Sequence, residues 1–183
     1  MSNDKALLNP TPPTGEEHRV DAVFGMAKEM IGHVPAGMRL YGVSPPLLEL
    51  FAGTVGYFRS GTALSPQLTT MIRYLGSERA KCQFCIDMNE GFLTSMGADL
   101  DAARAARDDI ERAPVEAREL PLLKLAMHAV SNPDQDAAPL IDEARAAGWG
   151  ERELFDAVLQ AASNRAFNFV LKTFNVENEE AFV

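Results

Sequence analysis

Apolar residues recur along this chain at the spacing of one face of an α-helix, and this pattern excludes most other folds. The clearest example has apolar side chains at Val20, Val23, Ala27, Met30 and Ile31. No stretch alternates between polar and apolar residues as a half-buried strand does, and the sequence has no Asn-Gly hairpin signal. The sequence therefore predicts an all-α fold, a multi-helix bundle with short joints.

Two Ser-Pro pairs mark predicted helix starts. Serine is a favoured N-cap residue, and proline fits the first helical position because no N–H is needed there. Ser44-Pro45 opens one helix, and Ser65-Pro66 opens another that we expect to end at Gly76. Further helices are predicted at 78–97, 99–112, 115–131, 136–147 and 151–174.

The N-terminal segment differs from the rest of the chain. Residues 1–15 are rich in proline and threonine, which predicts a flexible arm. Thr14 and Glu17 fit a capping box at the start of the first helix. Since the chain has 183 residues, we expect a single all-α domain over 16–183.

The net charge of the chain limits the classes of molecule that it is expected to bind. The formal net charge is −9, whereas nucleic acids and anionic membranes bind basic surfaces. No apolar run approaches the roughly 18 residues of a membrane span, and no secretory signal is visible. We therefore expect a cytoplasmic protein that binds neither nucleic acid nor membrane.

The segment KCQFCIDMNE, residues 81–90, contains both cysteines of the chain, Cys82 and Cys85. They can be a redox dithiol, half of a zinc site, or two buried apolar residues. Zinc needs four ligands, and the three histidines are scattered, so we expect no metal. On a helix, Cys82, Cys85 and Asn89 share one side. Because Cys85 also lies on the apolar stripe, we expect it to be the more buried thiol.

Two longer segments carry a resemblance to a known family. They are LSPQLTTMIRYLGSERAKCQFCIDMNEGFLTSMG and LIDEARAAGWGERELFDAVLQAASNRAFNFVLKTFNV. In order and spacing they resemble the carboxymuconolactone decarboxylase / alkylhydroperoxidase D-like superfamily over roughly residues 35 to 176. The C-x-x-C pair resembles the alkylhydroperoxidase arm, because the decarboxylase arm generally lacks it. The resemblance implies an alkylhydroperoxidase D-like bundle that forms homo-oligomers.

The resemblance also implies roles for individual residues. Cys85 would attack a hydroperoxide and Cys82 would resolve the sulfenic acid into a disulfide, without a cofactor. The family has a histidine at the position of Asn89 and a glutamate at the position of Thr70, which together relay a proton. Neither Asn89 nor Thr70 can accept a proton at neutral pH, so we expect Cys85 to lack its base.

The function predicted on this basis is a thiol-dependent peroxidase or disulfide oxidoreductase. Its partners would be a small hydroperoxide or disulfide and a dithiol reductant. One alternative is a redox-degenerate oligomer that binds a small ligand or a partner without turnover. Decarboxylation is a third possibility that we disfavour, because it would leave the dithiol idle.

Residues of the segment 151–174 add two expectations. Arg165 lies among apolar residues and predicts a salt bridge more readily than substrate binding. Asn164 and Asn168 are one turn apart and can line a pocket, although amides are more common on helix surfaces. Phe155 and Phe169 are among the apolar residues on more than one side of this helix, which predicts a symmetric oligomer.

Overall fold

The structure is a computed structural model that describes residues 7–176. Within this range the chain is all-helical and has no strand, which confirms the predicted fold class. The α-helices are α1 (Glu17–Ile31), α2 (Ala36–Leu40), α3 (Pro45–Ser60), α4 (Pro66–Ala80), α5 (Gln83–Ser95), α6 (Leu100–Ala105), α7 (Leu120–Ser131), α8 (Ala138–Ala146) and α9 (Glu151–Thr173). Two short 3-10 helices, η1 (Tyr41–Val43) and η2 (Ile110–Arg112), lie between them.

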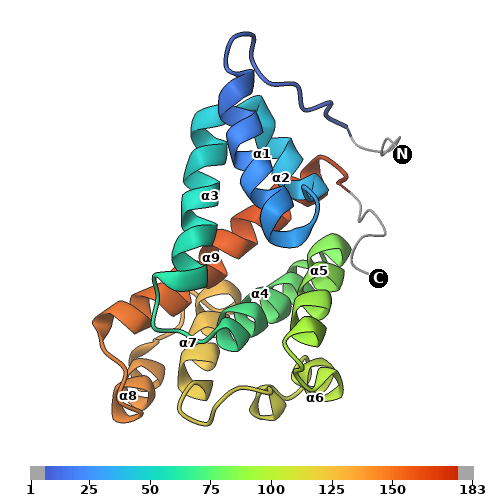
Figure 1. The fold of residues 1–183 in the computed structure, drawn as a ribbon. Coiled ribbons are helices and arrows are strands. Elements are labelled where there is room, and N and C mark those ends of the chain that lie inside the picture. The colour runs from blue at the N-terminus through green and yellow to red at the C-terminus, as the bar shows by residue number, and fades with distance from the viewer. Residues whose placement is uncertain (1–6, 177–183) are drawn as a thin grey trace.

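The long helix α9 is the axis of the arrangement (Figure 1). It runs between α1–α3 in the upper part of the view and α4–α8 in the lower part. α4 and α7 pack directly on α9, while α5 packs on α4 and α8 on α7. The largest apolar core lies among α4, α7 and α9, and it includes the fully buried residues Leu68, Met71, Ile72, Leu122, Leu123 and Ala161. A smaller core around Leu40, Phe84 and Leu171 surrounds the two cysteines.

The prediction that the second Ser-Pro helix ends at Gly76 is wrong. α4 continues past this glycine to Ala80, and its C-cap residue Lys81 has a left-handed backbone with φ 52°. A Cβ at Gly76 would lie 3.2 Å from Asn164 Nδ2, so this glycine permits the close approach of α9. As a consequence, the helix predicted over 78–97 begins only at Gln83.

The starts of the helices agree with the sequence signals in part. Pro45 and Pro66 both lie in the first turn of their helices, as predicted. The Ser65 hydroxyl accepts a hydrogen bond from the Leu68 N–H at 3.0 Å, whereas Ser44 makes no such bond. In these two helices proline at the first turn is thus the consistent start signal.

The predicted capping box at Thr14 does not form. α1 starts at Glu17 with Glu16 as its N-cap residue, and no side chain caps it. The Glu17 carboxylate instead accepts a hydrogen bond from the Gly15 N–H at 2.8 Å. Glu17 therefore bonds the backbone of Gly15, and the Thr14 side chain does not cap the helix.

Other boundaries differ because the helices are shorter than the periodicity suggested. The segment 99–112 folds as α6 and η2, and the segment 115–131 becomes helical only at Leu120. Pro121 lies in the first turn of α7, the one place where a helix does not need its missing N–H. Helix α2 and the turn η1 were not predicted.

The N-terminal arm predicted over 1–15 begins with residues outside the described range. Its described part, residues 7–15, contains no helix. The Leu7 N–H donates a hydrogen bond to the Phe174 carbonyl at 3.0 Å, which joins this part to the end of α9. The flexibility of the arm and the domain boundary at residue 16 remain predictions. Between residues 7 and 176, no helix combines the length and the apolar character that crossing a bilayer requires.

Candidate functional site

The two cysteines lie at a sharp joint between α4 and α5. Lys81 is the C-cap residue of α4, Cys82 is the N-cap residue of α5, and Cys85 lies in the first turn of α5. The Cys82 N–H donates to the Ser77 carbonyl at 3.0 Å, which holds the joint closed. The expectation that both cysteines lie inside one helix is therefore corrected. Cys82 precedes the helix, because α4 extends further than its glycine suggested.

The two thiols are free and in direct contact. Their Sγ atoms lie 2.7 Å apart, within hydrogen-bonding distance, and they form no disulfide. The exposed fraction is 2% for Cys82 and 0% for Cys85, so both residues are buried. The difference is small, but Cys82 lines a surface pocket of about 440 Å³ and Cys85 is not part of its lining. The accessible side of Cys82 faces this pocket, as expected for the thiol nearer the helix start.

The surroundings shift the pKa values of the two thiols in opposite directions. A hydrogen bond from Cys85 lowers the pKa of Cys82, with further help from the positive charge of Lys172. The hydrogen bond to Cys82 and burial both raise the pKa of Cys85. Of the two thiols, Cys82 is therefore the more acidic and Cys85 the less acidic. The family resemblance, by contrast, implies that Cys85 is the thiol that attacks.

A buried polar network lies beside the sulfurs. Ser77 of α4 accepts hydrogen bonds from Asn164 and Asn168 of α9 at 3.2 and 3.3 Å. The Asn164 amide also donates to the Asn168 carbonyl oxygen at 3.2 Å. Asn168 lowers the pKa of both cysteines by hydrogen bonding, with a smaller effect than the contact between the sulfurs. Asn164 and Asn168 thus belong to the interior of the site rather than to the helix surface.

The two positions of the family's proton relay are connected by an arginine that sequence analysis missed. Arg73 Nε donates to Asn89 Oδ1 at 3.1 Å, and Arg73 Nη2 donates to Thr70 Oγ1 at 2.9 Å. Burial lowers the pKa of Arg73 to about 10, so the guanidinium remains charged at neutral pH. A signal was available, because Arg73 follows Thr70 by one helical turn in an otherwise apolar stretch of α4.

Asn89 does not bond a sulfur atom. Its amide nitrogen donates to the Cys85 carbonyl at 2.7 Å, so it bonds the backbone of the second cysteine. Thr70 donates its hydroxyl proton to the Pro66 carbonyl at 2.7 Å. In this arrangement neither side chain can take a proton from a thiol, and Arg73 cannot either.

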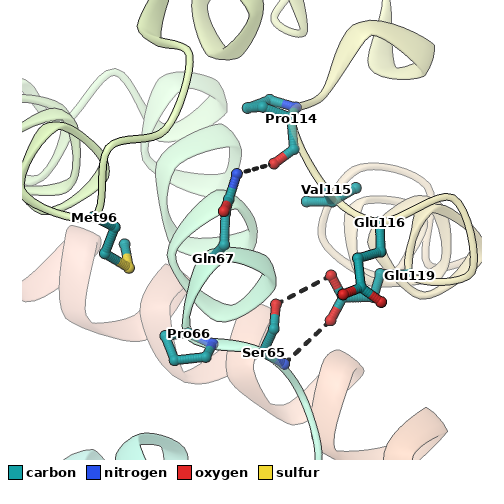
Figure 2. A pocket seen from close by; sticks show the side chains of 8 residues that line it. All are labelled: Ser65, Pro66, Gln67, Met96, Pro114, Val115, Glu116 and Glu119. Carbon is teal, nitrogen blue, oxygen red and sulfur yellow. Dashed lines mark hydrogen bonds between the residues drawn. The ribbon is translucent and has the colours of Figure 1, made fainter.

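Two pockets lie near polar side chains. One, with a volume of about 440 Å³, is lined by Cys82, Gln83, Phe84, Leu171, Lys172, Asn175 and Val176. The other is larger, about 620 Å³, and lies between the start of α4 and the segment before α7. Figure 2 shows that its buried carboxylate, Glu119, faces Ser65, whose N–H and hydroxyl both donate to it. This carboxylate holds Ser65, the N-cap residue of α4. No thiol or histidine lines the larger pocket, so the thiol pocket is the candidate site.

The folds of known proteins agree with this architecture. A peroxidase-related protein from a Silicibacter species superposes with a TM-score of 0.85 at 17% identity, over 98% of this chain and 95% of its own. A Ralstonia eutropha protein described as an alkylhydroperoxidase AhpD core has a TM-score of 0.84 at 13% identity, over 99% and 96% of the two chains. The chain has the alkylhydroperoxidase D-like fold.

This fold confirms the architecture implied by the family resemblance, but it does not identify a reaction. A cysteine-to-alanine variant of the debrominase Bmp8, in complex with 2,3,4-tribromopyrrole, is similar at a TM-score of 0.77 and 17% identity, over 97% of this chain and 95% of its own. No protein-family model and no curated protein matches the sequence. Proteins of the alkylhydroperoxidase D-like fold thus include more than one described activity, and function must be argued from the thiols.

Proposed function

We propose that Cys82 and Cys85 form a redox dithiol that reduces a small hydroperoxide or disulfide at the expense of an external dithiol. The observation that carries this proposal is the contact of two free thiols with opposite pKa shifts, one of which, Cys82, lines a pocket. A pair of inert buried cysteines needs neither a pocket nor a difference in acidity. Thiolate reactivity depends on both, since only the ionised and accessible sulfur attacks.

The steps follow from the positions of the sulfurs. The Cys82 thiolate attacks the outer oxygen of a hydroperoxide, the O–O bond breaks, and the alkoxide that leaves takes a proton from water. Cys82 is then a sulfenic acid, which Cys85 attacks to form the disulfide and release water. An external dithiol reduces the disulfide by exchange and restores both thiols. With a disulfide as substrate, the Cys82 thiolate attacks one sulfur and the other leaves as a thiolate, which gives a mixed disulfide. Cys85 loses its proton to water and attacks the Cys82 sulfur, which releases the second substrate thiolate and forms the Cys82–Cys85 disulfide.

In this assignment Cys82 is the nucleophile and Cys85 the resolving thiol, the reverse of the order implied by the family resemblance. The reversal agrees with the substitution of the relay residues. A thiol with a lowered pKa is already ionised in part and needs no neighbouring base, so Asn89 and Thr70 are compatible with activity.

The test is a thiol count on the native protein. One equivalent of an organic hydroperoxide should convert two titratable thiols to none without intermolecular crosslinks, and dithiothreitol should restore both. Turnover should then be measured with the same hydroperoxide and a dithiol reductant. Thiols that stay free after peroxide treatment would rule out the proposal and favour the non-enzymatic alternative. Matched samples of the Cys82→Ser, Cys85→Ser double variant control for oxidation elsewhere.

A further inference from the structure

The thiol pocket is built by the ends of two helices. One wall comes from the start of α5, with Cys82, Gln83 and Phe84. The other comes from the end of α9 and the residues just after it, with Leu171, Lys172, Asn175 and Val176. The chemistry of these two helix ends therefore determines which molecules can approach Cys82.

The end of α9 folds back on itself. Asn175 has a left-handed backbone with φ 53°, a conformation that asparagine tolerates better than most residues. Its N–H donates to the Lys172 carbonyl at 3.2 Å, and the Val176 N–H donates to the Leu171 carbonyl at 2.9 Å. This is the hydrogen-bond pattern of a Schellman ending. Two of the last carbonyls of α9 are thus satisfied within the chain, which reduces the negative potential on this side of the pocket.

The start of α5 favours negative charge. Beside the hydrogen bond from the Cys85 thiol, a hydrogen bond from the Cys85 backbone lowers the pKa of Cys82. The first N–H groups of a helix have no carbonyl partner within it, and they give its start a positive potential. Neither helix end therefore opposes an anion in the pocket.

Lys172 is the only charged residue among those that line this pocket. Its Nζ donates to the Ala80 carbonyl at 2.8 Å, which fixes the ammonium beside the end of α4. An ammonium has three N–H donors, and this bond uses one of them. None of residues 7–176 forms an ion pair with Lys172, and its side chain is exposed. A ligand can therefore reach a cation that lacks a carboxylate partner in the described part of the chain.

Two other charged side chains lie close in the sequence but do not line the pocket. Asp87 accepts a hydrogen bond from Gln83 Nε2 at 2.6 Å. Arg165, two turns before Lys172 on α9, stacks over the Phe169 ring at 4.8 Å. The salt bridge predicted for Arg165 does not form with any of residues 7–176. The charge preference of the pocket thus depends on Lys172.

The rest of the lining suits a small apolar body. Phe84 and Leu171 are buried residues of the same apolar cluster, and Val176 packs against it. The volume of about 440 Å³ lies within the range of small-molecule sites, which combine apolar walls with a few polar groups. A fitting ligand has an apolar body and one anionic group.

We infer that the substrate is an organic hydroperoxide that carries a carboxylate, which Lys172 binds while the hydroperoxide group reaches Cys82. The carboxylate serves for binding only, and the reaction is the one given above. That the ligand is a hydroperoxide rests on the proposed function, whereas the carboxylate site rests on the pocket alone.

The first test compares para- and meta-carboxy cumene hydroperoxide with their methyl esters, which lack the charge. For at least one isomer, wild-type kcat/KM should be about fivefold or more higher for the acid, as one well-placed ion pair gives. Lys172→Gln should make acid and ester equal, and Lys172→Arg should keep the preference. The loss of Lys172 also raises the pKa of Cys82, but this slows acid and ester alike, so the ratio isolates binding.

Lys28→Gln is the matched control for the lost charge, because Lys28 is exposed in the last turn of α1 and does not line the pocket. This variant should keep the wild-type preference. Equal kcat/KM for acid and ester in the wild type, or a preference that survives Lys172→Gln, would overturn the inference.

The second test needs no turnover. The alcohols formed from these hydroperoxides are unreactive, and they should protect Cys82 from alkylation by iodoacetamide, measured by mass spectrometry. The carboxylated alcohol should protect at about fivefold lower concentration than its methyl ester, and Lys172→Gln should remove the difference. This pattern in a protein without peroxidase activity would keep the carboxylate site and reject the proposed function. Equal protection by acid and ester, or none by either, would overturn the inference even in an active enzyme.

Discussion

The two sides of the dithiol differ although its sulfurs are 2.7 Å apart. On the pocket side, Cys82 precedes a helix and receives the positive potential of Lys172. On the inner side, Cys85 is completely buried, and its backbone carbonyl accepts a hydrogen bond from Asn89. The first setting stabilises a thiolate and the second a neutral thiol.

In the proposed function, this difference makes Cys82 the nucleophile, the reverse of the order that the family resemblance implies. Spacing alone makes the two sulfurs equivalent, so the choice of nucleophile depends on what surrounds each of them. A relay of glutamate and histidine would act on the inner side. Here Thr70, Arg73 and Asn89 occupy that side without a base, while on the pocket side Cys82 has a lowered pKa and lines a pocket.

Replacing each cysteine in turn should have the largest effect on turnover. It also tests whether Cys82 or Cys85 is the nucleophile. Cys82→Ser and Cys85→Ser should both lower steady-state turnover by ~10³-fold or more, as the loss of a nucleophile or its partner does. With one equivalent of hydroperoxide, Cys85→Ser should accumulate a sulfenic acid at Cys82 that mass spectrometry detects after trapping. Cys82→Ser should give none. The opposite labelling would return the role of nucleophile to Cys85.

The amide shared by both sides should have a large effect on stability. Asn168→Leu removes the acceptor of Asn164 and a donor to Ser77, leaving buried groups unpaired at a cost of about 1–3 kcal/mol. Urea unfolding measures this change in the free energy of unfolding. Ser163→Ala, on the same helix and only half-buried, is the control, with an expected change within about 0.5 kcal/mol. Equal effects of both variants would mean that the amide network adds no stability.

Some of this site was predictable from local sequence. The C-x-x-C pair and the Ser-Pro helix starts are local signals, and the structure retains them. The prediction took Gly76 as the end of a helix. This position instead lies against Asn164 of α9, far along the chain, and a side chain there would crowd that residue. The same limit hid the role of Arg73, since its partner Asn89 lies on another helix. Burial of Asn164 and Asn168 was equally unpredictable, because their helix turns its polar side inward.

Two substitutions at Cys85 test whether its hydrogen bond lowers the pKa of Cys82. The rate of alkylation of Cys82 should rise with pH through a midpoint below that of an ordinary thiol, because its pKa is lowered and more thiolate exists at each pH. Cys85→Ala removes the hydrogen-bond donor, so the midpoint should move to higher pH. Cys85→Ser keeps a donor and should move it less. Identical profiles for the two variants would show that the contact between the sulfurs does not set the acidity.

The smallest effect is expected from restoring the family histidine on the inner side. If Cys82 attacks, Asn89→His places a base beside the wrong sulfur, and turnover at pH 7 should change by less than about threefold. If Cys85 attacks, a positioned base should raise turnover by about 10²-fold. The guanidinium of Arg73, 3.1 Å from the Asn89 oxygen, would keep the introduced imidazole neutral and able to accept a proton, so the test is fair to both possibilities.

Two further variants complete this comparison. Asn89→Leu controls for the lost hydrogen bond to the Cys85 carbonyl. Asn89→His combined with Thr70→Glu restores both relay positions and gives Arg73 a carboxylate partner. A strong gain in turnover that requires both substitutions would show that Cys85 is the attacking thiol and lacks only the base that the relay supplies. Unchanged turnover in all three variants, beside an active wild type, would leave the pocket side and Cys82 as the reactive end.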